Sequence, residues 1–378
     1  MSLPGPPGAS VSDAAPSKGA TAVELFFDLI FVFAVTRTSE LLQLDHSLPG
    51  VLRAVVVFVP VFWLWVGATM FSNLSEPDSA RGRPVLLLLS GAAMVTALAL
   101  PEAYGDRAWM FALGYWVGRS VLWAAVARHP HRSEFITFPI GAVLTGPLLQ
   151  LGAFLEPGPR TAVWAAVAVV ELSIPLLRRR RVVTTPFDTG HLAERYSTFV
   201  IIALGETVVA TGIGAAELES PGIEMLAAAL GLAVCCGLRW TYFDLAAPAI
   251  EQVLARSSAP IDVIRPDLSY GHLLLMAGII AVAAGIGAAV SAPSDPLPHA
   301  SALIVMGGCS VYLATFGFTR WRLLHTIAIP RLAWAVACLL LIPVIVRIPA
   351  LAALICIVVL LAAINLADQL RERGRSIV

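Results

Sequence analysis

Apolar residues run in long blocks along this chain, and each block is close to the length of a membrane-spanning helix. After residue 20 the pattern predicts about twelve segments near the ~20 residues that a helix needs to cross a bilayer. The expected spans are 23–43, 51–71, 84–101, 107–127, 135–155, 161–177, 194–214, 222–244, 270–291, 299–318, 331–346 and 348–368. The third, sixth, eleventh and twelfth are short or run together, so the pattern allows ten to twelve spans. It predicts an all-α polytopic transmembrane bundle.

The domain organisation expected from this pattern is simple. Residues 1–20 are rich in Pro, Gly, Ala and Ser and predict a disordered cytoplasmic tail. Residues 21–370 form a single transmembrane helical domain, and residues 371–378 form a short basic cytoplasmic tail. No cleavable signal peptide is expected, because the first twenty residues lack an apolar core.

Composition supports the membrane class and excludes several others. The chain has 378 residues, of which 58% are hydrophobic and 13% charged, whereas soluble domains carry roughly 25% charge. The net charge is zero, so the sequence gives no basic footprint for nucleic acid. The lipid bilayer is the expected partner, and the sequence gives no oligomeric state.

Neither a cofactor nor a metal ion is expected. The five cysteines lie in apolar segments without C-x-x-C spacing and are interpreted as small buried hydrophobes. His129 and His131 lack the further ligands that a zinc site needs. Residues 285–290 resemble a dinucleotide-binding motif but lack its third glycine and a preceding strand.

The distribution of cationic residues predicts the topology. One set of alternate loops, together with both tails, holds seventeen Lys and Arg residues, whereas the other set holds only Arg53, Arg107, Arg160 and Arg347. The positive-inside rule therefore places both termini in the cytoplasm, and the alternation favours an even number of spans.

The first and seventh spans suggest an internal repeat. Glu24 opens one span and Glu194 opens the other, and Trp63 and Trp240 follow at similar offsets in the next span of each half. Two parallel six-helix repeats would result. Alternatively, the likeness reflects only the aromatic-rich composition of such helices.

Charged residues inside the expected spans are the candidate functional groups, because an acid at the centre of a membrane helix costs about 2.5–3.5 kcal/mol. The candidates for an ion or substrate pathway are Glu24, Asp28, Arg119, Glu194, Arg195, Glu206, Arg239, Asp244 and His272. Such residues either lock helices together as ion pairs or form a path for protons or ions.

Depth along the helices suggests partners for these charges. Glu206 is expected to pair with Arg119, and Asp28 with Arg239 or Arg195. Glu24, Glu194 and Arg195, near helix ends, are interpreted mainly as anchoring or snorkelling groups. His272 is either a proton relay or an interfacial histidine bonded to a neighbouring helix. A permeation role further requires that the buried acids converge on one hydrated cavity.

Three segments resemble the signatures of the bacterial low temperature requirement A (LtrA) family. They are Glu24–Thr36, Glu194–Ala210, and Trp240–Asp244 followed by Tyr270–Gly278. Arg37 stands where members of this family often have Gln. The resemblance implies a polytopic protein of the bacterial inner membrane whose molecular activity is not established, and it strengthens the candidacy of Glu24, Asp28, Glu194, Glu206 and His272.

Two functions from different classes follow as hypotheses. The first is a secondary transporter or ion-conducting protein in which Asp28 and Glu206 bind a proton or cation, with a proton, a cation or a small molecule as the candidate substrate. The alternative is a non-transporting structural component that supports envelope function or growth at low temperature. An enzyme is not expected, because no nucleophile or metal cluster can be identified.

Overall fold

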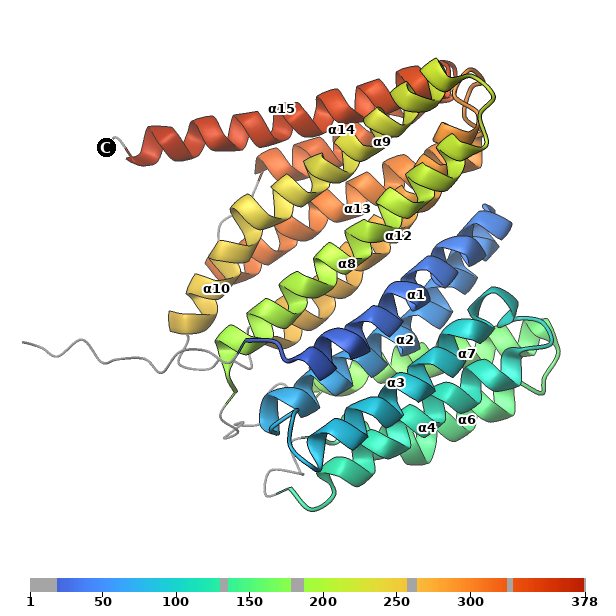
Figure 1. Ribbon diagram of the computed structural model, residues 1–378, viewed down its shortest axis with the longest axis vertical. Coiled ribbons are helices and arrows are strands. Elements are labelled where there is room, and N and C mark those ends of the chain that lie inside the picture. The colour runs from blue at the N-terminus through green and yellow to red at the C-terminus, as the bar shows by residue number, and fades with distance from the viewer. Residues whose placement is uncertain (1–18, 130–134, 178–186, 257–263, 325–328, 377–378) are drawn as a thin grey trace, which may run out of the picture.

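Most helices of the protein carry apolar residues on nearly every side, as expected for segments that face both lipid and other helices. The computed structural model describes residues 19–129, 135–177, 187–256, 264–324 and 329–376, and these ranges contain helices and no named strand (Figure 1). The predicted all-α class is therefore confirmed. Most of the predicted disordered tail, residues 1–18, lies outside the described residues.

The helices follow the expected spans closely. Their bounds are α1 (Ala22–Leu44), α2 (Leu48–Leu74), α3 (Gly82–Ala99) with η1 (Leu100–Glu102), α4 (Ala108–Val126), α5 (Thr137–Ile140), η3 (Gly141–Thr145), α6 (Gly146–Gly152), α7 (Pro157–Leu177), α8 (Thr189–Ala216), α9 (Pro221–Thr241), η4 (Tyr242–Ala246), α10 (Ala247–Arg256), η5 (Ile264–Gly271), α12 (His272–Ser291), α13 (His299–Leu324), α14 (Ile329–Ile345) and α15 (Ala350–Ser376). Eight helical segments in the described ranges are long and apolar enough to cross a membrane.

Several helices continue beyond their expected ends. The eighth predicted span ends at residue 244, but the helix continues through η4 and α10 to Arg256. Likewise, α15 extends to Ser376, so most of the predicted basic tail is helical. Hydropathy marks where the apolar surface ends, whereas backbone hydrogen bonds carry a helix onward into polar sequence.

Local sequence fixes where the two central helices begin. At the start of α1, the Glu24 carboxylate accepts the Thr21 backbone N–H at 2.9 Å and the Thr21 hydroxyl at 3.0 Å. At the start of α8, Asp188 accepts the His191 backbone N–H at 3.0 Å. These carboxylates satisfy N–H groups that have no partner within the first turn.

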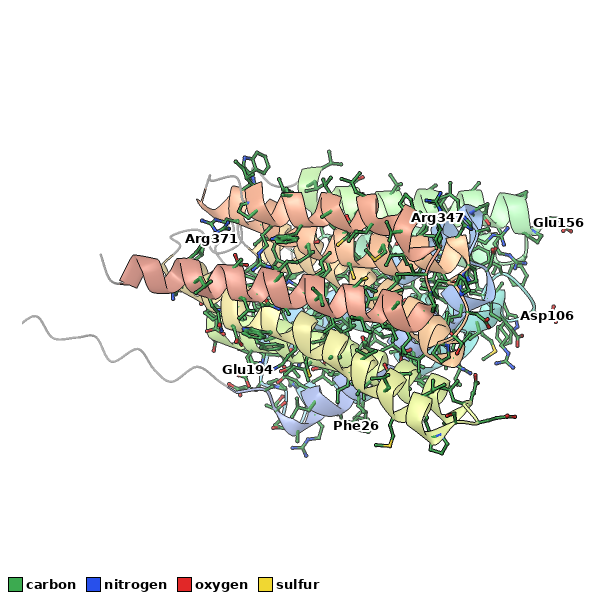
Figure 2. The ribbon with its side chains drawn as sticks, turned by 90° about the horizontal axis from the view of Figure 1, so that it is seen from above. Phe26, Asp106, Glu156, Glu194, Arg347 and Arg371 are labelled. Atoms are coloured by element: carbon green, nitrogen blue, oxygen red, sulfur yellow. The ribbon has the colours of Figure 1, made fainter. Side chains whose placement is uncertain are left out.

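The helices form two groups that follow one another in sequence (Figure 1). Helices α1 to α7 pack together, as do α8 to α15, and the groups meet where α1 and α2 lie against α8 and α12. Figure 2 shows Asp106, Glu156 and Arg347 toward one end of the bundle and Glu194 and Arg371 toward the other. The charged loop residues are thus separated between the two ends.

Helices α12 and α13 approach closely because glycines face each other. A Cβ atom added at Gly308 would lie 2.8 Å from the Gly278 carbonyl oxygen, whereas one added at the adjacent Gly307 would meet nothing within 4 Å. Gly307 and Gly308 are therefore neighbouring positions of α13 of which one is open and the other crowded.

We expect Gly308→Ala to destabilise the protein by about 1–3 kcal/mol, because the backbones must separate to admit the methyl group. Gly307→Ala should leave stability unchanged or raise it by up to about 1 kcal/mol, since alanine favours helix. Thermal unfolding of the detergent-solubilised variants measures both effects. Equal melting temperatures for the two variants would contradict the close approach.

Candidate functional site

Two acids of α1 share one arginine of α8 in the interior of the bundle. Arg195 Nη1 lies 2.6 Å from Glu24 Oε1, and Arg195 Nη2 lies 2.7 Å from Asp28 Oδ1. All three side chains are 0% exposed. Glu24 and Asp28 are four residues apart and so lie on the same side of α1, which lets one guanidinium reach both. This ion network joins the two helix groups.

His191 completes the network on α8. The Asn73 carboxamide oxygen accepts the Asp188 N–H at 3.1 Å, and its nitrogen donates to the Asp188 carbonyl at 2.8 Å. The same nitrogen lies 3.1 Å from His191 Nδ1, so Nδ1 accepts and the ring proton belongs on Nε2. Nε2 lies 3.1 Å from Glu24 Oε1. The hydrogen-bond pattern therefore assigns a neutral imidazole that donates to Glu24.

The Glu24 and Asp28 carboxylates differ in how many hydrogen-bond donors surround them. Glu24 is surrounded by the Thr21 donors, His191 and Arg195. Asp28 Oδ1 accepts from Trp65 Nε1 at 2.8 Å and from Arg195, while Asp28 Oδ2 has no hydrogen-bond partner among the described residues. The Asp28 carboxyl is the less stabilised of the two as an anion.

The ion network has fewer positive than negative charges. With His191 neutral, two carboxylates face one guanidinium, which leaves a net negative charge in a sealed site. An uncompensated buried charge costs several kcal/mol, so such sites bind a proton or a cation. The unpartnered Asp28 Oδ2 is the atom best placed to carry that proton.

These contacts correct part of the sequence interpretation. Glu24 and Arg195 are not snorkelling groups, since both are fully buried. Of the two candidate partners of Asp28, Arg195 is the one that binds it, because Arg239 pairs with Asp244 at 3.4 Å on an exposed surface. Depth along a helix predicts neither its rotation nor its neighbours.

Glu206 is also buried, but it does not pair with Arg119 as predicted. Its carboxylate accepts a hydrogen bond from the Thr36 hydroxyl of α1, and the residue is 3% exposed. Arg119 of α4 instead pairs with Glu171 of α7 at 3.1 Å. That prediction was wrong because α4 belongs to the first helix group and does not lie beside α8.

The Arg119–Glu171 pair is a fully formed internal link. Glu171 also accepts hydrogen bonds from the Tyr115 hydroxyl at 2.6 Å and from the Thr145 hydroxyl. Arg119 donates in addition to the Thr137 carbonyl. One cation here faces one carboxylate, so this link within the first group is balanced.

Aromatic side chains separate Asp28 from Glu206 along the seam between α1 and α8. Phe199 of α8 stacks on Trp65 at 4.2 Å and lies 6.3 Å from Phe31 of α1. Arg195 and Glu206 are eleven residues apart, or about 17 Å along α8 at ~1.5 Å per residue. The expectation that Asp28 and Glu206 share one hydrated cavity is not met, because this aromatic layer lies between them.

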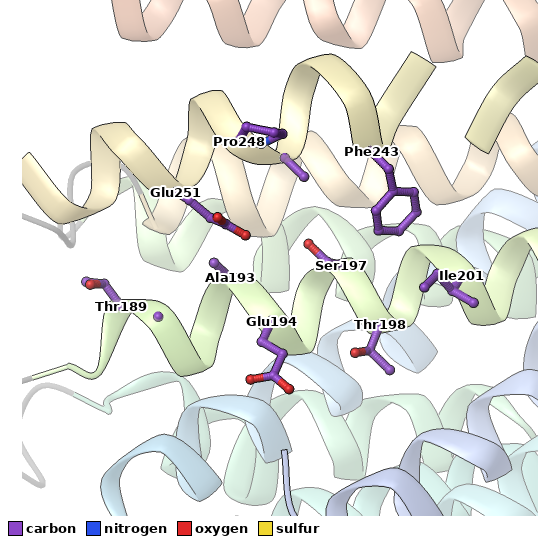
Figure 3. A pocket seen from close by; sticks show the side chains of 11 residues that line it. Thr189, Ala193, Glu194, Ser197, Thr198, Ile201, Phe243, Pro248 and Glu251 are labelled. Atoms are coloured by element: carbon purple, nitrogen blue, oxygen red, sulfur yellow. The ribbon is translucent and has the colours of Figure 1, made fainter. Parts of the chain in front are cut away.

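His272 and Glu194 lie outside the ion network. His272 is 2% exposed, and its Nε2 is 2.9 Å from the Tyr242 hydroxyl of η4, so it is bonded to a neighbouring helical segment. Glu194 is exposed, accepts the Ala20 backbone N–H at 3.2 Å, and lines a cavity of about 530 Å³ (Figure 3).

Among the described residues, no group of three or more His, Cys, Asp and Glu side chains could hold a metal ion. All five cysteines are free, but Cys236 is exposed and Cys356 only partly buried, so the expectation that all are buried is wrong for these two.

Comparison with known proteins places the chain in a family. The sequence profile of the bacterial low temperature requirement A protein (LtrA) matches residues 19–366. The chain belongs to the LtrA family. It is also 32% identical over 305 residues, covering 77% of this chain and 74% of the relative, to a Rhizobium meliloti (strain 1021) protein described as "Uncharacterized protein RA0937". No solved structure matches the chain.

The family resemblance seen in the sequence is thereby confirmed, and its segments hold most of the ion network. Sequence reasoning missed His191, Asn73 and Trp65. His191 precedes Arg195 by four residues and thus lies on the same helix side, a signal that could have identified it. Asn73 and Trp65 come from α2, whose position next to α1 and α8 is a tertiary property.

We expect Arg195→Met to destabilise the protein by about 3–5 kcal/mol, because it leaves two buried carboxylates without their cation. The loss should be smaller at acidic pH than at neutral pH, since protons then neutralise the carboxylates. Melting temperatures of the variant and the wild type at acidic and neutral pH test it.

Two further variants sharpen this test. Adding Asp28→Asn to Arg195→Met should recover part of the stability, because it removes one unpaired charge. Arg53→Met, which breaks a 3.5 Å pair with Asp45 that is 45% and 40% exposed, should change stability by less than about 1 kcal/mol. A pH-independent loss without rescue would show that Arg195 acts through packing.

Proposed function

We propose that this LtrA-family protein is a proton-coupled secondary transporter or ion-conducting membrane protein whose path follows the seam between α1 and α8. The observation that carries the proposal is the sealed network in which Glu24 and Asp28 share Arg195. An ion pair that only holds helices together is most stable when its charges balance. A site that binds and releases a proton needs a carboxylate whose charge is not already balanced by a cation. No covalent chemistry is assigned to these residues.

Two protonatable stations lie along this seam. Asp28 is the first and Glu206, bonded to Thr36, is the second. The aromatic layer of Phe31, Trp65 and Phe199 lies between them. We infer that the described arrangement is occluded, and that movement of α1 against α8 opens one station at a time, as in alternating access.

Matching packing orders in the two helix groups support an internal repeat. In the first group α1 packs on α2 and α3, α3 on α4, α4 on α6, and α2 on α7. In the second group α8 packs on α9 and α12, α12 on α13, α13 on α14, and α9 on α15. We propose twelve spans in two parallel six-helix repeats, with α1 and α8 as equivalent helices at their junction.

We also propose that the protein lies in the bacterial inner membrane with both termini in the cytoplasm. The Arg distribution supports this orientation, and Arg371 and Arg347 lie toward opposite ends of the bundle (Figure 2). Asp106 and Glu156, on the same end as Arg347, would then face the periplasm.

A fusion experiment tests the orientation. Green fluorescent protein fused after the C-terminus should fluoresce, because it folds in the cytoplasm, and alkaline phosphatase fused after Glu156 should be active, because it requires export. The exchanged pair of fusions is the control and should give weak signals. Strong signals from the exchanged pair would invert the topology.

Proton flux in proteoliposomes tests the function. We expect the purified protein to acidify or alkalise the lumen under an imposed pH gradient and membrane potential. Asp28→Asn and Glu206→Gln should each reduce the flux about tenfold or more, because neither amide can carry a proton. A pH-sensitive dye inside the vesicles measures the rate.

Glu171→Gln is the matched control, since Glu171 is equally buried but lies outside the seam. It should lower the melting temperature and leave the flux per folded molecule close to that of the wild type. Unchanged flux in both seam variants would remove Asp28 and Glu206 from the mechanism.

The alternative, a non-transporting structural component, is favoured by one observation. The Arg119–Glu171 link shows that this bundle also uses buried ion pairs as balanced internal links. If the seam has the same role, no flux above that of empty vesicles will occur, and Asp28→Asn will change only stability.

A further inference from the structure

A cavity of about 530 Å³ opens between α8 and the segment formed by η4 and α10 (Figure 3). Its lining residues come from the first turns of α8 and from these two elements, at the bundle end that carries Glu194 in Figure 2. The volume falls within the range of about 300–1,000 Å³ that is typical of small-molecule sites.

The lining has the chemistry of a site for a cation with an apolar body. Glu251 supplies a carboxylate, Ser197 a hydroxyl and Phe243 an aromatic ring, whereas the Glu194 carboxylate points away from η4 and α10 and accepts the Ala20 N–H (Figure 3). Among the described residues that line this cavity there is no Lys, Arg or His. Carboxylates with an aromatic face are the groups that bind organic ammonium ions.

An inorganic cation fits this cavity less well. Metal ions require several oxygen ligands that converge at about 2.0–2.6 Å, and the described residues contain no group of three or more acidic, His or Cys side chains that could supply them. Only two of the lining residues are acidic, and the space is large enough for an organic molecule.

A chain of buried polar and aromatic groups connects this cavity to the proton site. Ser197 Oγ lies 3.4 Å from the Tyr242 hydroxyl, which lies 2.9 Å from His272 Nε2. Tyr196 then contacts both the His272 ring and the Trp65 ring, each at 4.9 Å between centroids. Trp65 donates to Asp28, so an occupant of the cavity is linked through packed side chains to the ion network.

We propose that this cavity binds an organic ammonium ion with a small apolar body, held by the carboxylate of Glu251 and the ring of Phe243, with Glu194 at the edge of the cavity. The further assignment of this cavity as the substrate site of the transporter rests on the proposed function. The shared chemistry is an alkylammonium group, whether on a soluble amine or on the ethanolamine head group of a membrane lipid.

Binding of choline to the full-length protein in detergent tests the proposal, with 3,3-dimethyl-1-butanol as the uncharged isostere. Isothermal titration calorimetry should show binding of choline and at least about tenfold weaker binding of the alcohol, which lacks the charge. Glu251→Gln should weaken choline binding about tenfold, and Phe243→Ala should weaken it as well.

Asp244→Asn is the matched control, because Asp244 is a partly exposed acid of η4 outside the cavity lining. It should bind choline like the wild type. The comparison of choline with its isostere uses only wild-type protein, so it stays decisive if a variant fails to fold.

A second arm distinguishes the two sources of the ammonium group. Native mass spectrometry of protein extracted from nanodiscs that contain phosphatidylethanolamine and phosphatidylglycerol reports which lipid is retained. Selective retention of phosphatidylethanolamine, lost in Glu251→Gln, identifies a lipid ligand, whereas choline binding without it identifies a soluble one. Both outcomes support an ammonium site.

Equal binding of choline and its isostere, or binding of neither choline nor phosphatidylethanolamine, overturns the proposal. The transport proposal is judged separately. Asp28-dependent flux without ammonium binding would support the proton path between α1 and α8 and reject ammonium ions as ligands of the cavity. Ammonium binding without any flux would keep the site and reject transport.

Discussion

The structure depends on one arginine that two buried acids share. Arg195 of α8 holds Glu24 and Asp28 of α1, and this contact lies where the first helix group meets the second. In a sealed interior no water can replace a missing partner, so the three groups fix the register of α1 against α8. The charges do not sum to zero when His191 is neutral, the form that the 3.1 Å contact of its Nδ1 with the Asn73 amide nitrogen favours. A network of this kind both joins the halves and favours uptake of a proton.

The other buried acids show why this imbalance matters. Glu171 faces one arginine within a single helix group and also accepts two hydroxyl donors, so it is suited to hold helices together. Glu206 has a hydroxyl partner at the junction of the groups. The acids associated with the proposed path thus lie at the junction, while the balanced pair lies inside one group. A relative movement of the groups would change the surroundings of Asp28 and Glu206 and leave Glu171 undisturbed.

Helix α8 connects the two proposed sites because consecutive residues of a helix point about 100° apart. Arg195 points into the ion network, whereas its neighbour Glu194 lines the cavity beside α10. The ring of the next residue, Tyr196, contacts the rings of both His272 and Trp65. Three successive residues therefore contact the proton site, the cavity and the packing between them. Ligand in the cavity and a proton on Asp28 would act on the same helix turn.

The sequence alone determined the class of protein and the positions of its helices, because apolar length and the distribution of charge depend on composition along the chain. It also identified Glu24, Asp28, Arg195 and Glu206 as unusual, since each is costly in an apolar helix. It did not determine their partners: Glu206 was paired with Arg119, and Glu24 and Arg195 were placed near the surface. Those contacts depend on how each helix rotates and which helix lies beside it, and side-chain packing decides both. His191, Asn73 and Trp65 entered the site only when α1, α2 and α8 came together.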